Sequence, residues 1–279
     1  MKTINIKGQL VDFNEPLVMG IVNITPDSFY SASRKQDEAD IIARIQQIVD
    51  EGGKIIDIGG QSSNPKSPFL SAEEEMSRLR YALAIINREF PDITISVDTF
   101  YGSVAAECVE KYGVAIINDI SGGQIDKDMF KTAARLQVPY ILMHMRGTPQ
   151  DMNQKTDYKN LIQDIFLYFS EKIRELNLLG VNDIIVDPGF GFSKTLDQNY
   201  ELFAALRGFE ILDCPLLVGI SRKSMIYNLL GISSAESLNG TTVLNTFALQ
   251  NGANILRVHD VKAAVEAVKI TEKLKQYAF

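Results

Sequence analysis

Short apolar segments alternate with longer segments of helical periodicity along the whole chain. The apolar segments are rich in Ile, Val and Leu and contain few polar residues, which is typical of strands buried on both faces of a parallel sheet. Between them, apolar residues recur every three or four positions, which indicates helices that cross from one strand to the next. The predicted strands are Leu17–Val22, Ile55–Ile58, Thr94–Val97, Ala115–Asn118, Tyr140–Met143, Ile184–Val186, Leu216–Ile220 and Ile255–Val258.

These strands and their crossover helices make about eight β/α units, which predicts an α/β fold of the (β/α)₈, or TIM barrel, class. The opening stretch Ile4–Phe13 lies before the first unit and predicts a β-hairpin across the lower end of the barrel. No linker or low-complexity tract divides the chain, so we expect a single domain over residues 1–279. The predicted helices are Ala39–Glu51, Ala72–Phe90, Gly102–Tyr112, Lys127–Leu136, Tyr158–Leu178, Leu196–Leu206, a helical region that ends near Gln250, and Val261–Tyr277.

Composition and charge narrow the range of functions. The length of 279 residues and the hydrophobic content of 46% fit one barrel with an ample core. The net charge of −7 argues against general nucleic-acid binding, which usually needs a basic surface. The N-terminus lacks the apolar core of a signal peptide, and no apolar run reaches the roughly 18 residues of a membrane span. We therefore expect a cytoplasmic protein that binds neither nucleic acid nor membrane, with Cys108 and Cys214 as reduced thiols.

Polar or ionisable residues stand at the ends of most predicted strands. Asp98, Asn118 and Asp187 are examples, and the active sites of barrel enzymes are built at these carboxyl ends. Their carboxylate and amide oxygens suit a ligand with several N–H donors, such as a pterin or a purine ring. Each aspartate, Asp119 included, could instead cap the helix that follows, and His144 could be structural.

A basic, hydroxyl-rich run follows the seventh predicted strand. It contains Ser221, Arg222 and Lys223, while Arg257 and His259 stand at the end of the eighth strand. Barrels of this class often bind phosphate in the loops after strands seven and eight. These residues therefore predict an anion site, although Arg222 and Lys223 could instead form a solvated surface pair.

Three of the loops after strands are rich in turn-forming residues. They are Asn23–Phe29, Gly59–Pro65 and Asp187–Lys194. Loops of this kind carry binding and catalytic groups on a rigid scaffold. We expect them to surround the site.

Taken in order, these strand ends and loops closely resemble dihydropteroate synthase. The resemblance covers nearly the whole chain at plausible spacing. No single motif is specific, but the ordered set is. The motifs are Met19–Phe29, Ser96–Thr99, Asn118–Gly122, Leu142–Met145, Asp187–Phe192, Ser221–Ser224 and Arg257–Val261.

The resemblance implies a transferase of the alkyl/aryl-transferring class in folate biosynthesis. It would condense 6-hydroxymethyl-7,8-dihydropterin diphosphate with 4-aminobenzoate to give 7,8-dihydropteroate and diphosphate. The resemblance also implies a homodimer and a Mg²⁺ cofactor, with Asn23 as the protein's ligand to the metal. No residue resembles a covalent nucleophile, because the attacking group would be the arylamine of the substrate.

The same resemblance implies roles for individual residues. The catalytic residues would be Asp98, Asp187 and Lys223. The pterin would be bound by Asp98, Asn118, Met143, Asp187, Phe192, Lys223 and Arg257. The diphosphate would be bound by Asn23, Ser221, Arg257 and His259. The aminobenzoate would be bound by Thr25, Pro26, Ser62, Ser63, Pro65, Phe192, Lys223 and Ser224.

The second of the three loops departs from the family pattern Gly-Gly-Glu-Ser-Thr-Arg-Pro-Gly. Gln61 stands in place of glutamate, and Ser63 in place of threonine. Asn64 replaces arginine and lacks its charge and planar fork, while Lys66 replaces the final glycine. In the family this loop helps to form the aminobenzoate pocket. We therefore expect altered binding of aminobenzoate and of sulfonamides, which mimic it.

Two other functions remain open. A pterin-binding methyltransferase domain would share the barrel and the acidic residues, but it needs no diphosphate site, so the basic run argues against it. A catalytically idle pterin-binding protein is the second alternative, and the retention of Asn23, Asp98 and Lys223 argues against it.

The apolar positions of the last helices predict either a dimer face or packing on the barrel. They include Leu244, Phe247, Ala248, Val265 and Val268.

Overall fold

The structure of this chain, a computed structural model, describes residues 2–24, 34–61 and 67–277. Two strands in this part of the chain form a hairpin, β1 (Thr3–Ile6) and β2 (Gln9–Asp12). The remaining strands form one parallel sheet. They are β3 (Leu17–Asn23), β4 (Ile55–Gly59), β5 (Thr94–Asp98), β6 (Ile116–Asp119), β7 (Tyr140–Met143), β8 (Ile184–Asp187), β9 (Leu217–Val218) and β10 (Ile255–Val258).

Helices alternate with these strands along the chain. Two short 3₁₀ helices, η1 (Met152–Gln154) and η2 (Leu206–Leu212), lie in the longer connections. The α-helices are α2 (Arg34–Asp50), α3 (Ala72–Glu89), α4 (Gly102–Tyr112), α5 (Met129–Leu136), α6 (Leu161–Leu178), α7 (Leu196–Ala204), α8 (Ser224–Leu230), α9 (Leu238–Gln250) and α10 (Val261–Lys275).

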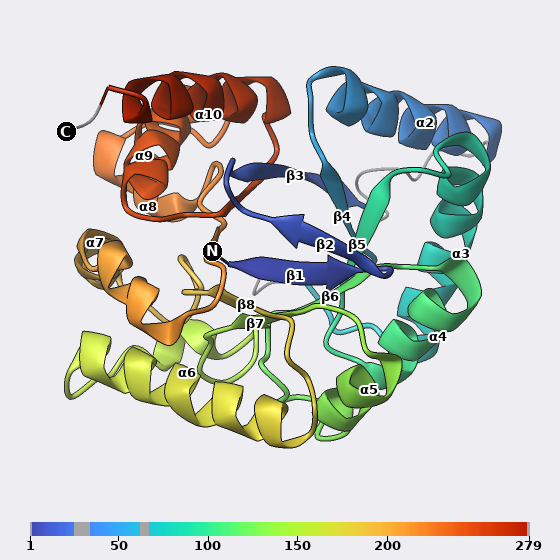
Figure 1. The fold of residues 1–279 in the computed structure, drawn as a ribbon, viewed down its shortest axis with the longest axis horizontal. Helices are drawn as coiled ribbons and strands as arrows, with labels where there is room; N and C mark the ends of the chain where they lie inside the picture. Colours follow the sequence, from blue (N-terminus) through green and yellow to red (C-terminus); the bar gives the residue numbers. More distant parts are fainter. Residues whose placement is uncertain (1, 25–33, 62–66, 278–279) are drawn as a thin grey trace.

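The parallel sheet curves into a barrel. Its strands pair in the order β8-β7-β6-β5-β4-β3-β10-β9, so the first strand of the barrel, β3, pairs with the last, β10. A parallel bridge between Val186 in β8 and Leu216 next to β9 connects the two ends of this order. The helices lie around the outside of the strands (Figure 1). The predicted (β/α)₈ barrel is confirmed.

Alternation along the strands separates an outer core from an inner one. In β4, Ile56 and Ile58 belong to the large core that the strands share with the surrounding helices, whereas Ile55 belongs to a separate core inside the barrel. This inner core is apolar at the lower end of the barrel. Further up the same strands the inward positions become polar, with Asp57 on β4 and Asn118 on β6. The polar layer forms the floor of the site described below.

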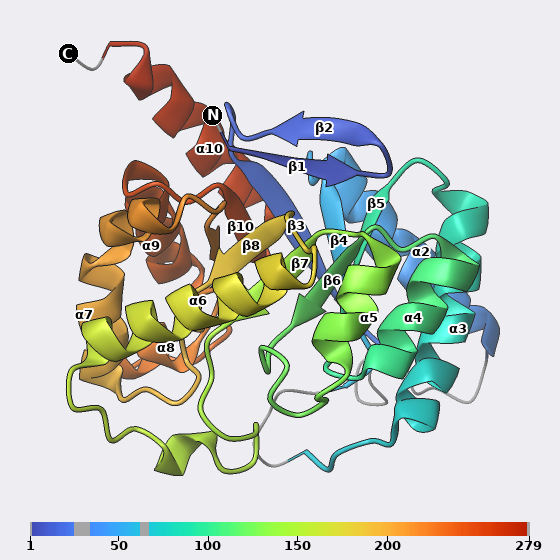
Figure 2. The same ribbon diagram turned by 60° about the horizontal axis from the view of Figure 1, so that its bottom comes forward.

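The hairpin closes the lower end of the barrel. Ile4, Ile6 and Phe13 are buried and pack against the inner core. The hairpin turn consists of Lys7 (φ 50°) and Gly8 (φ 83°), and positive φ at both central residues matches the right-handed twist of the paired strands. Figure 2 shows the hairpin at one end of the barrel and the long connections at the other. The predicted hairpin is confirmed.

Several predicted boundaries were wrong. The seventh strand of the barrel is only Leu217–Val218, because the chain turns at once and the Lys223 N–H donates to the carbonyl of Ile220. Helix α2 begins at Arg34 rather than Ala39. Helix α6 begins at Leu161 rather than Tyr158, because the Asn160 side chain accepts the Gln163 N–H and caps the helix there.

The apolar positions of the last helices mostly pack on the barrel. Ala248 and Val268 are buried, and Leu244 and Val265 lie against the same core, but Phe247 stays 53% exposed. Cys108 and Cys214 are free thiols, as predicted. Within the described residues, no helix combines the length and the apolar character needed to cross a membrane.

Candidate functional site

A cavity of about 570 Å³ opens at the carboxyl ends of the strands. Most of the residues predicted for the site line it. They are Asn23, Asp98, Asn118, Met143, Asp187, Phe192, Ser221, Lys223, Ser224, Arg257 and His259. The other predicted site residues, Thr25, Pro26, Ser62, Ser63 and Pro65, lie outside the described residues, as do Asn64 and Lys66.

The guanidinium of Arg257 lies at the centre of the cavity floor. Its Nε donates to Asp57 Oδ2 at 2.6 Å, and its Nη2 donates to Asp98 Oδ2 at 2.7 Å. Asp57 Oδ2 also accepts a hydrogen bond from Asn118 Nδ2 at 2.9 Å. These four side chains come from β10, β4, β5 and β6, and they form one network across the barrel.

Asp57 was missed in the sequence analysis. It is fully buried, and it lies beneath the residues that line the cavity. A signal for it exists in the sequence, because it is the one charge in the apolar run Ile55–Ile58. A carboxylate in the middle of a buried strand requires a partner of opposite charge. Arg257, which is 200 positions further along the chain, provides that charge.

Burial changes the protonation of the two catalytic candidates on the floor. Burial raises the pKa of Asp98 to about 7, although the nearby charge of Arg257 acts in the opposite direction. The pKa of Asp187 is also raised, mainly by burial, against the opposing effect of Lys223. Asp187 Oδ1 accepts the N–H of Gly189 at 2.8 Å, which fixes the carboxylate at the start of its loop.

Lys223 lines the same cavity as these carboxylates. Its Nζ donates to the carbonyl of Phe190 and lies 4.5 Å from the centre of the Phe192 ring. Burial lowers the pKa of Lys223 to about 8, although Asp187 favours its charged form. The solvated surface pair that was considered for Arg222 and Lys223 is therefore wrong for Lys223.

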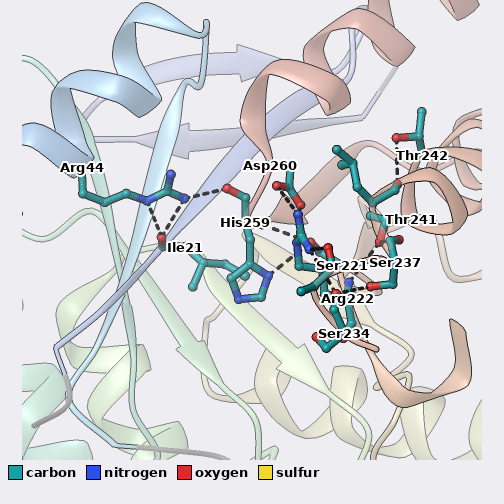
Figure 3. A network of polar contacts seen from close by, with 12 residues as sticks. Ile21, Arg44, Ser221, Arg222, Ser234, Ser237, Thr241, Thr242, His259 and Asp260 are labelled. Atoms are coloured by element: carbon teal, nitrogen blue, oxygen red, sulfur yellow. Dashed lines mark hydrogen bonds and ion pairs between the residues drawn. The ribbon is translucent and has the colours of Figure 1, made fainter. Parts of the chain in front are cut away.

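Ser221 and His259 meet at one side of the cavity (Figure 3). The His259 N–H donates to Ser221 Oγ at 3.2 Å, and the His259 ring Nδ1 lies 3.2 Å from the same oxygen. Burial, together with the charge of Arg257, lowers the pKa of His259 to about 4. At neutral pH this favours the uncharged form of His259 over the positively charged one. The imidazole is neutral and can serve as a hydrogen-bonding group.

Arg222 is held by the protein rather than by solvent. It forms a two-pronged ion pair with Asp260, with distances of 2.8 and 2.9 Å, and its Nη1 donates to the carbonyls of Ser234 and Ala235. Its backbone has a positive φ of 55° and its N–H donates to Thr241 Oγ1. Figure 3 shows this network beside Ser221. Although Arg222 borders the cavity, most of its donors are used in supporting the loop.

Two other strand-end residues have structural roles. Asp119 is fully buried and accepts hydrogen bonds from the N–H groups of Ser121 and Gly123 and from the hydroxyl of Tyr140. His144 is buried, and its Nδ1 lies 3.1 Å from the Nζ of Lys194. Neither residue lines the cavity, and the contacts of both agree with the structural roles considered for them.

The sequence analysis assigned no role to Lys194, but this residue stabilises the loop after β8. Its Nζ donates to the carbonyls of Gly189 and Phe192. Because Lys194 is buried, its pKa is lowered to about 7. The loop that it holds carries Phe192 into the cavity and offers the Phe190 carbonyl to Lys223.

Gln61 anchors the described part of the second loop. Its Oε1 accepts the Leu70 N–H at 2.9 Å, and its Nε2 donates to the carbonyl of Pro68 at 3.2 Å. The hydroxyl of Tyr101 donates to the Leu70 carbonyl at 2.8 Å. A glutamate at position 61 would lack the N–H that reaches Pro68, so this bond is specific to the glutamine.

Over the described ranges, no group of three or more His, Cys, Asp or Glu residues could hold a metal ion.

Comparisons with known proteins agree with this geometry. Residues 19–259 match the family model described as pterin binding enzyme. The chain is 38% identical over 268 residues to dihydropteroate synthase of Escherichia coli K12, covering 95% of this chain and 94% of the relative. It is 40% identical over 258 residues to dihydropteroate synthase of Clostridium beijerinckii, covering 91% and 93% of the two chains.

Solved structures are similar over nearly the whole chain. The structure of Yersinia pestis dihydropteroate synthase with a sulfonamide drug complex has a TM-score of 0.90 and 36% identity, covering 99% of this chain and 100% of that one. The structure of the Xanthomonas albilineans enzyme with 4-aminobenzoic acid has a TM-score of 0.87 and 32% identity, covering 98% of each chain. The resemblance stated from the motifs is confirmed, and this chain belongs to the dihydropteroate synthase family of pterin-binding enzymes.

Proposed function

We propose that this chain is a transferase that joins 6-hydroxymethyl-7,8-dihydropterin diphosphate to 4-aminobenzoate, with release of diphosphate, in folate biosynthesis. The observation that best supports this proposal is one cavity with two kinds of binding group. Its floor carries carboxylates and an amide, and a serine–histidine pair lies beside Arg257. The floor suits the several N–H groups of a pterin ring. The serine–histidine side offers hydrogen bonds and a nearby cation to an anionic leaving group.

The pterin would lie on the floor of the cavity. Asp98, Asn118 and Asp187 would accept hydrogen bonds from its amino and ring N–H groups, and Lys223 would donate to its carbonyl or ring nitrogen. Met143 and the planar guanidinium of Arg257 would contact the two faces of the ring, and Phe192 would lie near its reacting edge.

The diphosphate would lie beside Asn23, Ser221, Arg257 and His259. Asn23 ends β3 and borders the cavity, so its amide oxygen suits Mg²⁺, which commonly takes few protein ligands and several oxygens of substrate phosphate and water. When bound, Mg²⁺ would neutralise charge on the departing diphosphate.

The aminobenzoate would approach near Phe192, Lys223 and Ser224, with Thr25, Pro26, Ser62, Ser63 and Pro65 as further contacts carried over from the resemblance. The bond between the pterin methylene carbon and the diphosphate oxygen would break first. The arylamine nitrogen would then attack the methylene carbon and lose a proton. Scrambling of ¹⁸O from the bridging position of the pterin diphosphate, measured without aminobenzoate, tests this order, and the absence of scrambling there would contradict it.

We also propose a homodimer. Exposed apolar side chains on α8 and α9 support a second copy of the chain as partner, among them Leu229, Leu230, Val243 and Phe247. A cytoplasmic location stays a prediction from the sequence.

The activity is tested by coupled measurement of diphosphate release. Release should require both the pterin diphosphate and 4-aminobenzoate, and mass spectrometry should find 7,8-dihydropteroate. Diphosphate release that does not depend on the amine would contradict the proposal. Pterin binding without product would favour an idle pterin-binding protein, and methyl transfer to a corrinoid would favour the methyltransferase alternative.

A further inference from the structure

The buried carboxylate of Asp57 has no direct part in the proposed reaction. Asp57 lies in the middle of β4 beneath the cavity floor, where it is fully buried. Its Oδ2 accepts hydrogen bonds from Arg257 Nε at 2.6 Å and from Asn118 Nδ2 at 2.9 Å. Both of these side chains border the cavity, whereas Asp57 does not. The hydrogen bonds of Asp57 therefore connect it to a ligand through Arg257 and Asn118.

Asp57 determines which end of the Asn118 amide meets the ligand. A side-chain amide has a donor end and an acceptor end, and only its nitrogen can donate to a carboxylate. Asn118 Nδ2 is therefore held at Asp57. In the described part of the chain no hydrogen bond reaches Asn118 Oδ1, so this oxygen is available to accept an N–H group of the ligand.

Asp57 also holds Arg257 independently of Asp98. The guanidinium is bound on two sides, by Asp57 through Nε and by Asp98 through Nη2. Asp98 borders the cavity, so its carboxylate would be shared between Arg257 and a ligand that donates to it. Asp57 does not border the cavity, so its hydrogen bond to Arg257 Nε is not shared with a ligand. Asp57 therefore gives the guanidinium plane, on which stacking depends, a second support that ligand binding leaves in place.

We propose that Asp57 is a positioning residue that sets the affinity of the site for the pterin, by directing the Asn118 oxygen to the ligand and by keeping Arg257 in its stacking plane. The inference rests on the proposed function, because it takes the ring over Arg257 to be a pterin. It predicts that loss of Asp57 harms the pterin half of the site and leaves the aminobenzoate half intact.

The experiment compares Asp57→Asn and Asp57→Ala with the parent chain. Ser96→Ala is the matched control, because Ser96 is the register partner of Asp57 on β5, is fully buried, and has an Oγ without a hydrogen-bond partner among the described residues. Each protein is titrated with 6-hydroxymethylpterin by calorimetry, and KM is measured for both substrates. Circular dichroism and thermal unfolding report on the fold.

We expect Asp57→Ala to weaken pterin binding, and to raise the KM for pterin diphosphate, by at least tenfold. Asp57→Asn should fall between Asp57→Ala and the parent, because its amide oxygen still accepts hydrogen bonds but carries no full charge. The KM for aminobenzoate, and both constants of Ser96→Ala, should stay within twofold of the parent.

Pterin affinity within twofold of the parent in both folded variants would overturn the proposal. An equal rise of both KM values with a lowered unfolding temperature would also overturn it, because it would indicate a merely structural role. If Asp57→Ala does not fold, Asp57→Asn decides. Because the pterin titration needs no turnover, a parent chain that binds pterin but forms no dihydropteroate would contradict the proposed function and leave this test intact.

Discussion

Gly189 offers a sharp test of the loop that positions Asp187 and Phe192. Its φ is +71°, and a Cβ added there would lie 2.0 Å from the backbone carbonyl oxygen of His144. Ordinary contacts of a Cβ begin near 3.4 Å, so the two backbone segments would have to separate by more than an ångström. The obstacle is backbone rather than the end of a flexible side chain, and rotamer changes cannot relieve it.

The expected loss of stability in Gly189→Ala follows from these contacts. A left-handed backbone costs alanine about 1–2 kcal/mol, partly offset by about 0.4–1 kcal/mol from the stiffer unfolded chain. Separation of the segments would also break the buried hydrogen bond from the Gly189 N–H to Asp187 and the one from Lys194 to the Gly189 carbonyl. Hydrogen bonds to charged groups contribute about 1.5–3 kcal/mol each. Together these contributions should lower the free energy of unfolding by about 3–7 kcal/mol.

Gly180→Ala is the matched control, because Gly180 has a φ of +88° and nothing within 4 Å of an added Cβ. It should lose only the backbone contribution, about 1 kcal/mol or less. With a urea dependence near 3 kcal/mol per M, the midpoint should fall by about 1–2 M in Gly189→Ala and by about 0.3 M or less in the control. The KM for pterin diphosphate should rise only in Gly189→Ala. Equal midpoints for the two variants would refute the reasoning.

Three further predictions concern the site. The pH dependence of kcat/KM for pterin diphosphate should be bell-shaped, because Asp98 ionises near pH 7 and Lys223 loses its proton near pH 8. Lys223→Arg should remove the fall at alkaline pH, and a flat profile from pH 6 to 9 would contradict this prediction. Gln61→Glu should raise the KM for aminobenzoate about fivefold, as expected for about 1 kcal/mol from one lost hydrogen bond, and should leave the KM for pterin diphosphate unchanged. Joint substitution of Asn64→Arg and Lys66→Gly should lower the inhibition constant of a sulfonamide, and equal inhibition of both proteins would count against a role for this loop.

The residues at the strand ends were predictable because backbone topology alone brings them together. Parallel strands in a barrel end at the same rim, so Asp98, Asn118 and Asp187 had to lie close to one another wherever their side chains pointed. The order of apolar and polar segments established that topology. The hairpin was predictable for a similar reason, since Ile4–Phe13 precedes the first β/α unit and has no strand of the barrel to join.

The partners of these residues could not be derived in the same way. The guanidinium of Arg222 is bound by carbonyls 12 and 13 positions away and by Asp260, and this arrangement depends on the positive φ of Arg222. Asp119 and Asp98 have similar sequence settings, yet Asp119 turns toward Ser121 and Tyr140 and away from the cavity. Sequence patterns give the face on which a residue lies, whereas its hydrogen-bond partners depend on packing between distant segments.

The polar layer of the barrel explains why the cavity is suited to a ligand with both donors and acceptors. Burial raises the pKa of Asp98 to about 7 and lowers that of Lys223 to about 8. Burial therefore disfavours the charged form of both side chains. Beneath the floor, Arg257 Nε lies 2.6 Å from Asp57 Oδ2, and the two side chains form an ion pair. A ring that donates to Asp98 and accepts from Lys223 stabilises both charged forms. The same ring would lie over Arg257, whose Nε is bound to Asp57, so binding adds hydrogen bonds in the cavity and leaves this ion pair in place.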